Sequence, residues 1–168
     1  MHDLVIKNVH LSGAQIVDIG VRDGRIASIG ADLAAAPSAE VVDGRGCIAI
    51  PGLVDAHAHI DKTLWGTPWH PHNAGPSLMD KILNERQVLS GLGLKPEIQS
   101  ARLLRRLIGC GTTHIRTHVD VGPDVGLSHL HGVQAMREKY RAWFGIVMVA
   151  FPQTGVVIRP GTMALRGE

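Results

Sequence analysis

The sequence is poor in cysteine and has no long apolar run, and these two absences exclude several classes of protein. Its two cysteines, Cys47 and Cys110, form no closely spaced pair, so neither a disulfide framework nor a cysteine zinc site is indicated. The longest apolar run, FGIVMVAF at 144–151, is far too short to cross a bilayer. The first residues, MHDLVIKN, lack the charged-then-apolar pattern of a signal peptide. We therefore expect a cytoplasmic enzyme or binding protein without a membrane partner.

The charge balance gives no indication of a nucleic-acid partner. The formal net charge is +2, and the basic residues are scattered among the acidic ones. The densest basic stretch, RLLRR at 102–106, is interpreted as the solvated face of a helix. Zinc deaminases that act on bases within nucleic acids need H-x-E together with P-C-x-x-C, and the sequence contains neither motif. That enzyme class is therefore excluded.

The first fifty residues have the pattern of short β-strands. LVIKNVHL, QIVDIGVRDGRIASIG and AEVVDGRGCIAI alternate apolar and polar residues. Asp23-Gly24 stands between two such runs and predicts a hairpin turn. The stretch 32–39 is interpreted as a connector. Residues 1–50 are therefore predicted to form a small all-β domain with no chemistry of its own.

After Pro51 the pattern changes to alternating strands and helices. Ser77 and Asp80 have the spacing of a capping pair for the first helix, which we expect to end at the glycines 91 and 93. The predicted elements are strands at 53–60, 113–121 and 144–151 and helices at 77–91, 96–109 and 127–141. Buried apolar strands separated by helices are typical of βαβ units in a parallel sheet.

The last residues, RPGTMALRGE, have the pattern of a loop followed by the first turn of a helix. A parallel sheet of three strands would have an unpaired edge and uncovered faces. We therefore expect a truncated chain. The alternative, a compact three-stranded domain with a frayed tail, remains open.

The strongest candidate site is PGLVDAHAHIDKT at 51–63. Side chains alternate between the faces of a strand, so Asp55, His57, His59 and Asp61 share one face. Unpaired imidazoles in an apolar strand are costly, and neutral imidazole is a common ligand of zinc and iron. The H-x-H pair is therefore predicted to bind a metal ion. A hydrogen-bonded structural pair is the alternative.

The next predicted strand repeats this polar face with His114, Arg116, His118 and Asp120. In a barrel this face would point inward. His118 and Asp120 fall at the C-terminal end of the strand, where they could orient metal ligands or substrate. An internal ion pair of Arg116 with an acid is the alternative interpretation.

Two further features lie in loops after predicted strands. Gln153 offers a hydrogen-bond donor and an acceptor, the complement of an amide or a nucleobase edge, although a glutamine at a strand end usually faces solvent. A second H-x-H pair, His70 and His72, lies in the loop LWGTPWHPHNAGP at 64–76. Because no regular strand sets its geometry, we interpret it as a loop or lid feature rather than a metal site.

Three segments taken together resemble the cytosine deaminase branch of the metal-dependent amidohydrolase superfamily. They are IAIPGLVDAHAHIDKT, GTTHIRTHVDV and VAFPQTG, and the hairpin GRIASIG resembles the β-domain that precedes the barrel in those enzymes. The resemblance implies an α/β fold. Residues 51–168 would form the first three strands of a partial (β/α)8 TIM-type barrel, preceded by the small all-β domain.

The resemblance also implies one divalent metal ion, iron or zinc, that activates water to attack a C–N carbon of a cyclic, nucleobase-like substrate, with release of ammonia. By position, His57 and His59 would be two of the metal ligands, and Gln153 would bind the ring. Independently of the resemblance, the positions of Asp61, His118 and Asp120 at the strand ends make them candidates to support the ligands or the substrate. The substrate, the choice of iron or zinc and the oligomeric state are left open.

The other metal ligands and the proton-transfer residues of this family lie on later strands, so no catalytic residue is assigned in this chain. A complete barrel needs roughly 250 residues, and we therefore expect an incomplete enzyme with negligible turnover. Alternatives are an amidohydrolase that opens a cyclic amide or removes an amine from a triazine, or a non-catalytic fragment that binds a partner. The run Ile60-Asp61-Lys62, where dihydroorotase-like enzymes often have an arginine, favours the deaminase branch modestly.

Overall fold

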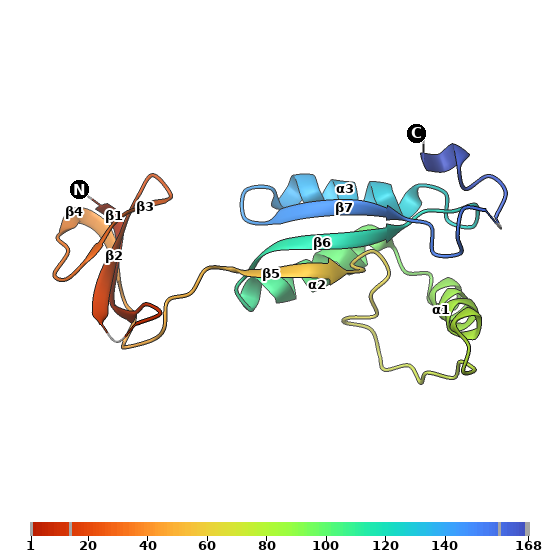
Figure 1. Cartoon of the computed structure of the whole chain (residues 1–168), viewed down its shortest axis with the longest axis horizontal. Coiled ribbons are helices and arrows are strands. Elements are labelled where there is room, and N and C mark those ends of the chain that lie inside the picture. The colour runs from red at the N-terminus through yellow and green to blue at the C-terminus, as the bar shows by residue number, and fades with distance from the viewer. Residues whose placement is uncertain (1, 14, 158, 167–168) are drawn as a thin grey trace. The chain divides into compact units, whose positions relative to one another are not determined.

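The computed structural model describes residues 2–13, 15–157 and 159–166, and it divides the chain into two compact units (Figure 1). The first unit comprises residues 1–51 and the second residues 52–168. Among the residues that the structure describes, no helix combines the length and the apolar character needed to span a bilayer.

The first unit is a four-stranded sheet with the strand order β3-β2-β1-β4. Its strands are β1 (His2–His10), β2 (Ile16–Arg22), β3 (Arg25–Gly30) and β4 (Ala35–Asp43). Asp23 and Gly24 join β2 to β3 with positive φ angles of 51° and 70°. Two positive φ angles in a two-residue loop are the type I′ geometry that fits the twist of a hairpin. The predicted hairpin is confirmed.

The expected connector at 32–39 is wrong in its second half, because β4 begins at Ala35. This strand pairs in parallel with β1, with Val5 opposite Val41. It lies at the edge of the sheet and is largely exposed, so packing imposes little apolar alternation on its first residues. An edge position also tolerates Pro37, which cannot donate a backbone hydrogen bond.

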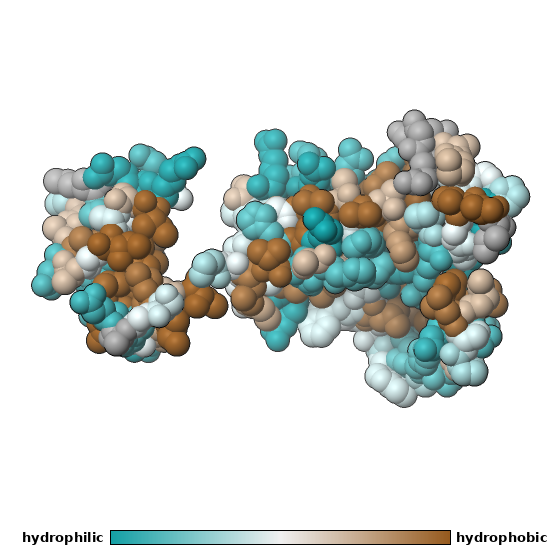
Figure 2. All heavy atoms as spheres, in the orientation of Figure 1, coloured by the Kyte–Doolittle hydropathy of each residue, from teal (hydrophilic) through white to brown (hydrophobic). Residues whose placement is uncertain are grey.

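Much of the apolar surface of the first unit remains exposed. Its buried hydrophobic residues are Val5, Val9 and Ile19. Figure 2 shows apolar atoms, in brown, gathered on the visible face of this unit. The exposed large apolar residues within it are Ile16, Ile26, Ile29, Val41, Val42, Ile48 and Ile50.

The second unit contains a three-stranded parallel sheet with the order β5-β6-β7. Its elements are β5 (Leu53–Ala58), α1 (Leu78–Leu92), α2 (Pro96–Gly109), β6 (Thr112–Asp120), α3 (Ser128–Tyr140), β7 (Gly145–Phe151) and the short 3-10 helix η1 (Ala164–Arg166). The predicted parallel strands are confirmed. The expected helical turn near the end is the 3-10 helix η1, and residues 167–168 of that predicted segment lie outside the described residues.

Helix α1 begins and ends where the sequence predicts. Ser77 Oγ accepts the backbone N–H of Asp80 at 3.1 Å, and Asp80 Oδ2 accepts that of Ser77 at 3.1 Å. This reciprocal capping box pairs two backbone donors that the first helical turn leaves free. At the other end, Gly93 adopts a left-handed φ of 56°, which a glycine accepts without steric cost.

The core of the second unit lies between the sheet and the helices α2 and α3. These helices pack against each other and against β6, and α3 also packs against β7 (Figure 1). Its buried residues are Ile60, Leu104, Ile115, Val119, Val133, Tyr140, Phe144 and Ile146. Along β6 the predicted alternation holds, because Ile115, Thr117 and Val119 are buried whereas His114 and Arg116 are exposed.

Two expectations for the strands need correction. The first strand ends at Ala58 rather than at residue 60, and Val54 on its apolar face is 68% exposed. The helices pack mainly on β6 and β7, which leaves β5 at a poorly covered edge. Arg116 makes no ion pair with any described residue, so the alternative of an internal ion pair is not observed.

Candidate active site

Three imidazoles meet at the C-terminal ends of β5 and β6. His57 lies on β5, His59 directly after it, and His118 on β6. Their ring centroids are 5.4 Å apart for His57–His59, 4.2 Å for His57–His118 and 5.7 Å for His59–His118. Phe151, the last residue of β7, lies edge-on to His59 at 5.2 Å. Parallel α/β sheets place their active sites at this end of the strands.

The His57–His59 pair fits the donor set of a metal ion. Two imidazoles that bind one zinc ion have centroids about 5 Å apart, because each metal–nitrogen distance is about 2.1 Å. The observed 5.4 Å and the edge-on arrangement agree with this spacing. The Nδ1 of His59 is buried and has no hydrogen-bond partner in the described part of the chain. Such an unpaired polar atom is costly unless a ligand uses it.

The third imidazole differs from this pair. His118 stacks on His57 with an angle of 27° between the rings, and its Nδ1 is also buried without a partner among residues 2–13, 15–157 and 159–166. Loss of solvation lowers the pKa of His118, and the neighbouring His57, His59 and Arg116 lower it further. These effects favour the neutral form of the ring. Across the described residues, no group of three or more His, Cys, Asp or Glu side chains is arranged to hold a metal ion.

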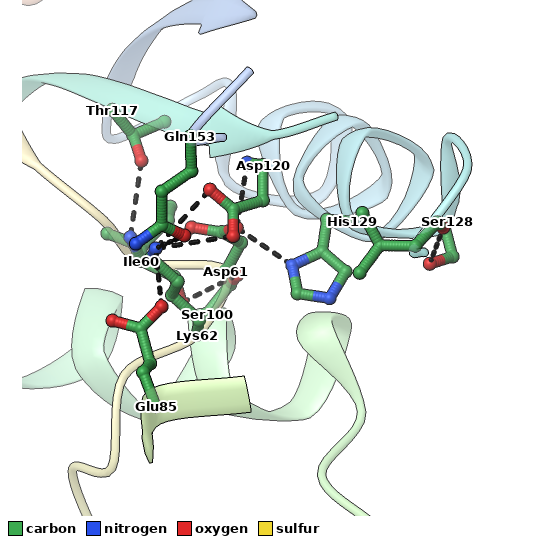
Figure 3. A network of polar contacts seen from close by, with 11 residues as sticks. Ile60, Asp61, Lys62, Glu85, Ser100, Thr117, Asp120, Ser128, His129 and Gln153 are labelled. Atoms are coloured by element: carbon green, nitrogen blue, oxygen red, sulfur yellow. Dashed lines mark hydrogen bonds and ion pairs between the residues drawn. The ribbon is translucent and has the colours of Figure 1, made fainter. Parts of the chain in front are cut away.

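Lys62 is the centre of a second polar cluster, the Lys62 network, which Figure 3 shows. Its Nζ lies 2.8 Å from Glu85 Oε1, 3.2 Å from Asp120 Oδ2 and 2.8 Å from Gln153 Oε1. The Lys62 side chain is only 6% exposed. A nearly buried ammonium must be paired, and these three acceptors match its three donors.

The negative charge of Asp120 is less favourable here than in water, although the carboxylate is paired with Lys62. Burial raises the pKa of Asp120, and the positive charge of Lys62 opposes that shift without cancelling it. The neighbouring carboxylates of Asp61 and Glu85 raise it further. Two carboxylates, those of Glu85 and Asp120, therefore pair with one lysine, and the charge of Asp61 acts on Asp120 as well.

Asp61 connects the end of β5 to β6 and α3 (Figure 3). Its side chain is fully buried; Oδ2 accepts the backbone N–H of Asp120 at 3.1 Å and lies 2.8 Å from His129 Nδ1. The preceding residue, Ile60, donates its N–H to Thr117 Oγ1 and accepts the Ser100 hydroxyl. These bonds hold the backbone between His59 and Lys62. Asp61 thus contacts His129, not the H-x-H pair with which the sequence groups it.

A cavity of about 470 Å³ lies beside this network, within the size range of small-molecule sites. Lys62 and Gln153 form part of its wall, and helix α1 forms another part. His70 and His72 lie in the loop between β5 and α1, and both border the cavity.

Sequence reasoning missed three members of these clusters, Lys62, Glu85 and His129. Lys62 could have been found, because it directly follows the run from His57 to Asp61. Glu85 lies in the middle of α1 and His129 near the start of α3, and no spacing in the sequence connects them to the strand ends. Only the packing of both helices brings them there.

This chain is similar to several solved structures of amidohydrolases and deaminases. No family model matches the chain. The structure of N-isopropylammelide isopropylaminohydrolase from Burkholderia multivorans ATCC 17616 is 45% identical, with a TM-score of 0.90 over 98% of this chain and 41% of that one. The structure of 5-methylcytosine deaminase from Klebsiella pneumoniae is 26% identical, with a TM-score of 0.79 over 96% of this chain and 39% of that one.

A curated relative agrees with these structures. N-isopropylammelide isopropyl amidohydrolase of Pseudomonas sp. (strain ADP) is 29% identical over 93% of this chain and 40% of its own length. The chain spans about two fifths of the length of each of these three proteins. The identity is higher with the N-isopropylammelide enzyme of Burkholderia than with the deaminase, so the cytosine deaminase branch is not singled out. The solved structures that this chain resembles are members of the metal-dependent amidohydrolase superfamily.

Proposed function

We propose that the chain carries part of the active site of a metal-dependent hydrolase that cleaves a C–N bond of a cyclic, nucleobase-like substrate. The observation that carries the proposal is the His57–His59 pair, whose rings have the spacing of metal ligands and in which the buried Nδ1 of His59 has no partner among the described residues. In this proposal β5, β6 and β7 are the first three strands of a (β/α)8 barrel. Residues 1–50 form the small β-domain that accompanies it.

In the proposal His57 and His59 hold one divalent ion, iron or zinc. Such an ion, when bound, supplies hydroxide at neutral pH by lowering the pKa of water. His118 stacks on His57 and limits the rotation of its ring. Asp61 fixes the backbone that follows His59, and Asp120 helps to hold Lys62. Gln153 binds an edge of the substrate ring.

We further propose that the 168-residue chain alone has negligible turnover. Two imidazoles are fewer protein ligands than the three or so that catalytic zinc sites use. The described residues contain no larger donor group. The chain should therefore bind a divalent ion weakly, at His57 and His59.

A chimera tests the proposed activity. Residues 1–168 would replace the matching part of the Burkholderia enzyme, with which they share 45% identity and a TM-score of 0.90. The chimera would be assayed with cytosine, 5-methylcytosine and N-isopropylammelide, and the released ammonia or amine would be measured. The identity values favour turnover of N-isopropylammelide over that of the two cytosines.

The matched variants decide whether the named residues matter. His57→Ala and His59→Ala should each abolish turnover by the chimera. His131→Ala, an exposed histidine on α3, should leave it unchanged. A folded chimera that turns over substrate equally well without His57 and His59 would overturn the proposal.

A further inference from the structure

In the hydrogen bond between Lys62 and Gln153, the chemistry of the two groups fixes which one donates and which one accepts. An ammonium group can only donate hydrogen bonds. Lys62 Nζ lies 2.8 Å from Oε1 of Gln153, so this oxygen is the acceptor. The remaining donors of Lys62 are directed to Glu85 and Asp120, which hold the ammonium in place.

This direction fixes the orientation of the Gln153 carboxamide. If the amide turned over, its NH2 group would face the ammonium, and two donors would meet without an acceptor. The charge of Lys62 makes that arrangement more costly in a nearly buried site. Nε2 of Gln153 has no hydrogen-bond partner among the described residues, and Gln153 borders the cavity of about 470 Å³. Its N–H groups are therefore available to a ligand there.

We infer that Lys62 is a positioning residue that makes Gln153 a hydrogen-bond donor toward the cavity, so that the site selects rings presenting an acceptor. A ring nitrogen with a free lone pair or a ring carbonyl oxygen meets this requirement. A ring N–H does not, because it would face another N–H group. The inference deepens the proposed function and rests on its assignment of Gln153 to ring binding. It narrows the sequence-based expectation, in which the carboxamide offered donor and acceptor alike.

Two small neutral rings test the preference in the full 168-residue chain. Pyrimidine presents only acceptors, whereas pyrrole presents only an N–H donor. Titration followed by the backbone amide NMR signals of residues that line the cavity would give both dissociation constants, in the wild type and in each variant. The wild-type chain should bind pyrimidine about tenfold more tightly than pyrrole, the value of one well-placed hydrogen bond.

Three variants separate positioning from general packing. Gln153→Glu keeps an oxygen for Lys62 but presents a second oxygen to the cavity, so the preference should reverse toward pyrrole. Lys62→Met should reduce the ratio of the two constants to about one, because the amide can then turn. Lys81→Met removes another lysine that borders the same cavity and should leave the ratio unchanged.

The inference is overturned if pyrrole binds as well as pyrimidine in the wild type, or if neither ring binds. It is also overturned if Gln153→Glu keeps the wild-type preference, a result that does not depend on whether Lys62→Met folds. Metal binding by His57 and His59 is a separate measurement. If the wild-type chain binds no metal ion but still prefers pyrimidine to pyrrole, the proposed metal site is rejected and the role of Lys62 is not.

Discussion

The imidazole cluster and the Lys62 network lie at the C-terminal ends of the same strands, but they differ in how their polar atoms are paired. In the network, each donor of Lys62 meets an oxygen, although Oδ1 of the neighbouring Asp61 is buried without a partner among the described residues. In the cluster, His59 and His118 each keep a buried nitrogen without a partner in the described regions. Buried polar atoms in folded proteins are nearly always paired. We therefore expect the paired ammonium of Lys62 and the Oδ2 contacts of Asp61 to stabilise the fold, and the unpaired imidazole nitrogens to be available to a ligand.

The largest expected effect comes from breaking the paired region at Asp61. Asp61→Ala removes the acceptor of the buried Asp120 N–H and the partner of the partly buried His129. We expect the free energy of unfolding to fall by about 3 kcal/mol. Urea denaturation measures this change.

An exposed acidic residue provides the matched control. Glu138 pairs with Arg141 at 3.9 Å on the surface of α3, so Glu138→Ala should cost at most about 0.5 kcal/mol. If both substitutions cost the same small amount, the network has no special part in stability.

A second prediction concerns the pH dependence of stability through Asp120. Its pKa is raised in the folded chain, so the folded state retains a proton that the unfolded state has already released. The contribution of Asp120 to the free energy of unfolding is therefore most favourable below its ordinary pKa. It declines as the pH rises through the folded pKa.

The difference between the wild type and Asp120→Asn isolates this contribution. The wild type should lose stability relative to the variant as the pH rises from about 4 toward neutrality. If the free energy of unfolding of the wild type instead rises relative to that of the variant over this range, the charge of Lys62 outweighs the effect of burial on the pKa of Asp120, and the prediction is wrong.

The smallest effect is expected in the unpaired region. His118→Phe keeps a ring that can stack on His57 and removes a nitrogen that has no partner in the described part of the chain. Without added metal, the free energy of unfolding should change by less than about 1 kcal/mol. A loss of 2 kcal/mol or more in urea denaturation would indicate that His118 is a paired structural residue.

The sequence predicted local features well because their causes are local. The capping pair Ser77 and Asp80, the turn at Asp23-Gly24 and the alternation along β6 each depend on neighbouring residues. The first residues of β4, 35–38, were assigned to a connector because an exposed edge strand needs no apolar alternation. The exposure of Val54 was missed because it depends on where the helices pack.

The same distinction applies to the site. The approach of His57 and His59 follows from their i, i+2 spacing at the end of one strand. The partners of Lys62 come from α1, β6 and the residues after β7, and no short-range pattern connects them. The orientation of the Gln153 carboxamide depends on this long-range contact. From the sequence alone, one can say only that the side chain has both a donor and an acceptor.

The most direct test of the central claim is a zinc titration of the 168-residue chain, followed by the NMR signals of the histidine rings. The account predicts saturable binding of one ion per chain that shifts the signals of His57 and His59. This binding should disappear in the double variant H57A/H59A and persist in H131A. Zinc binding that is equal in the wild type and in the double variant would contradict the account.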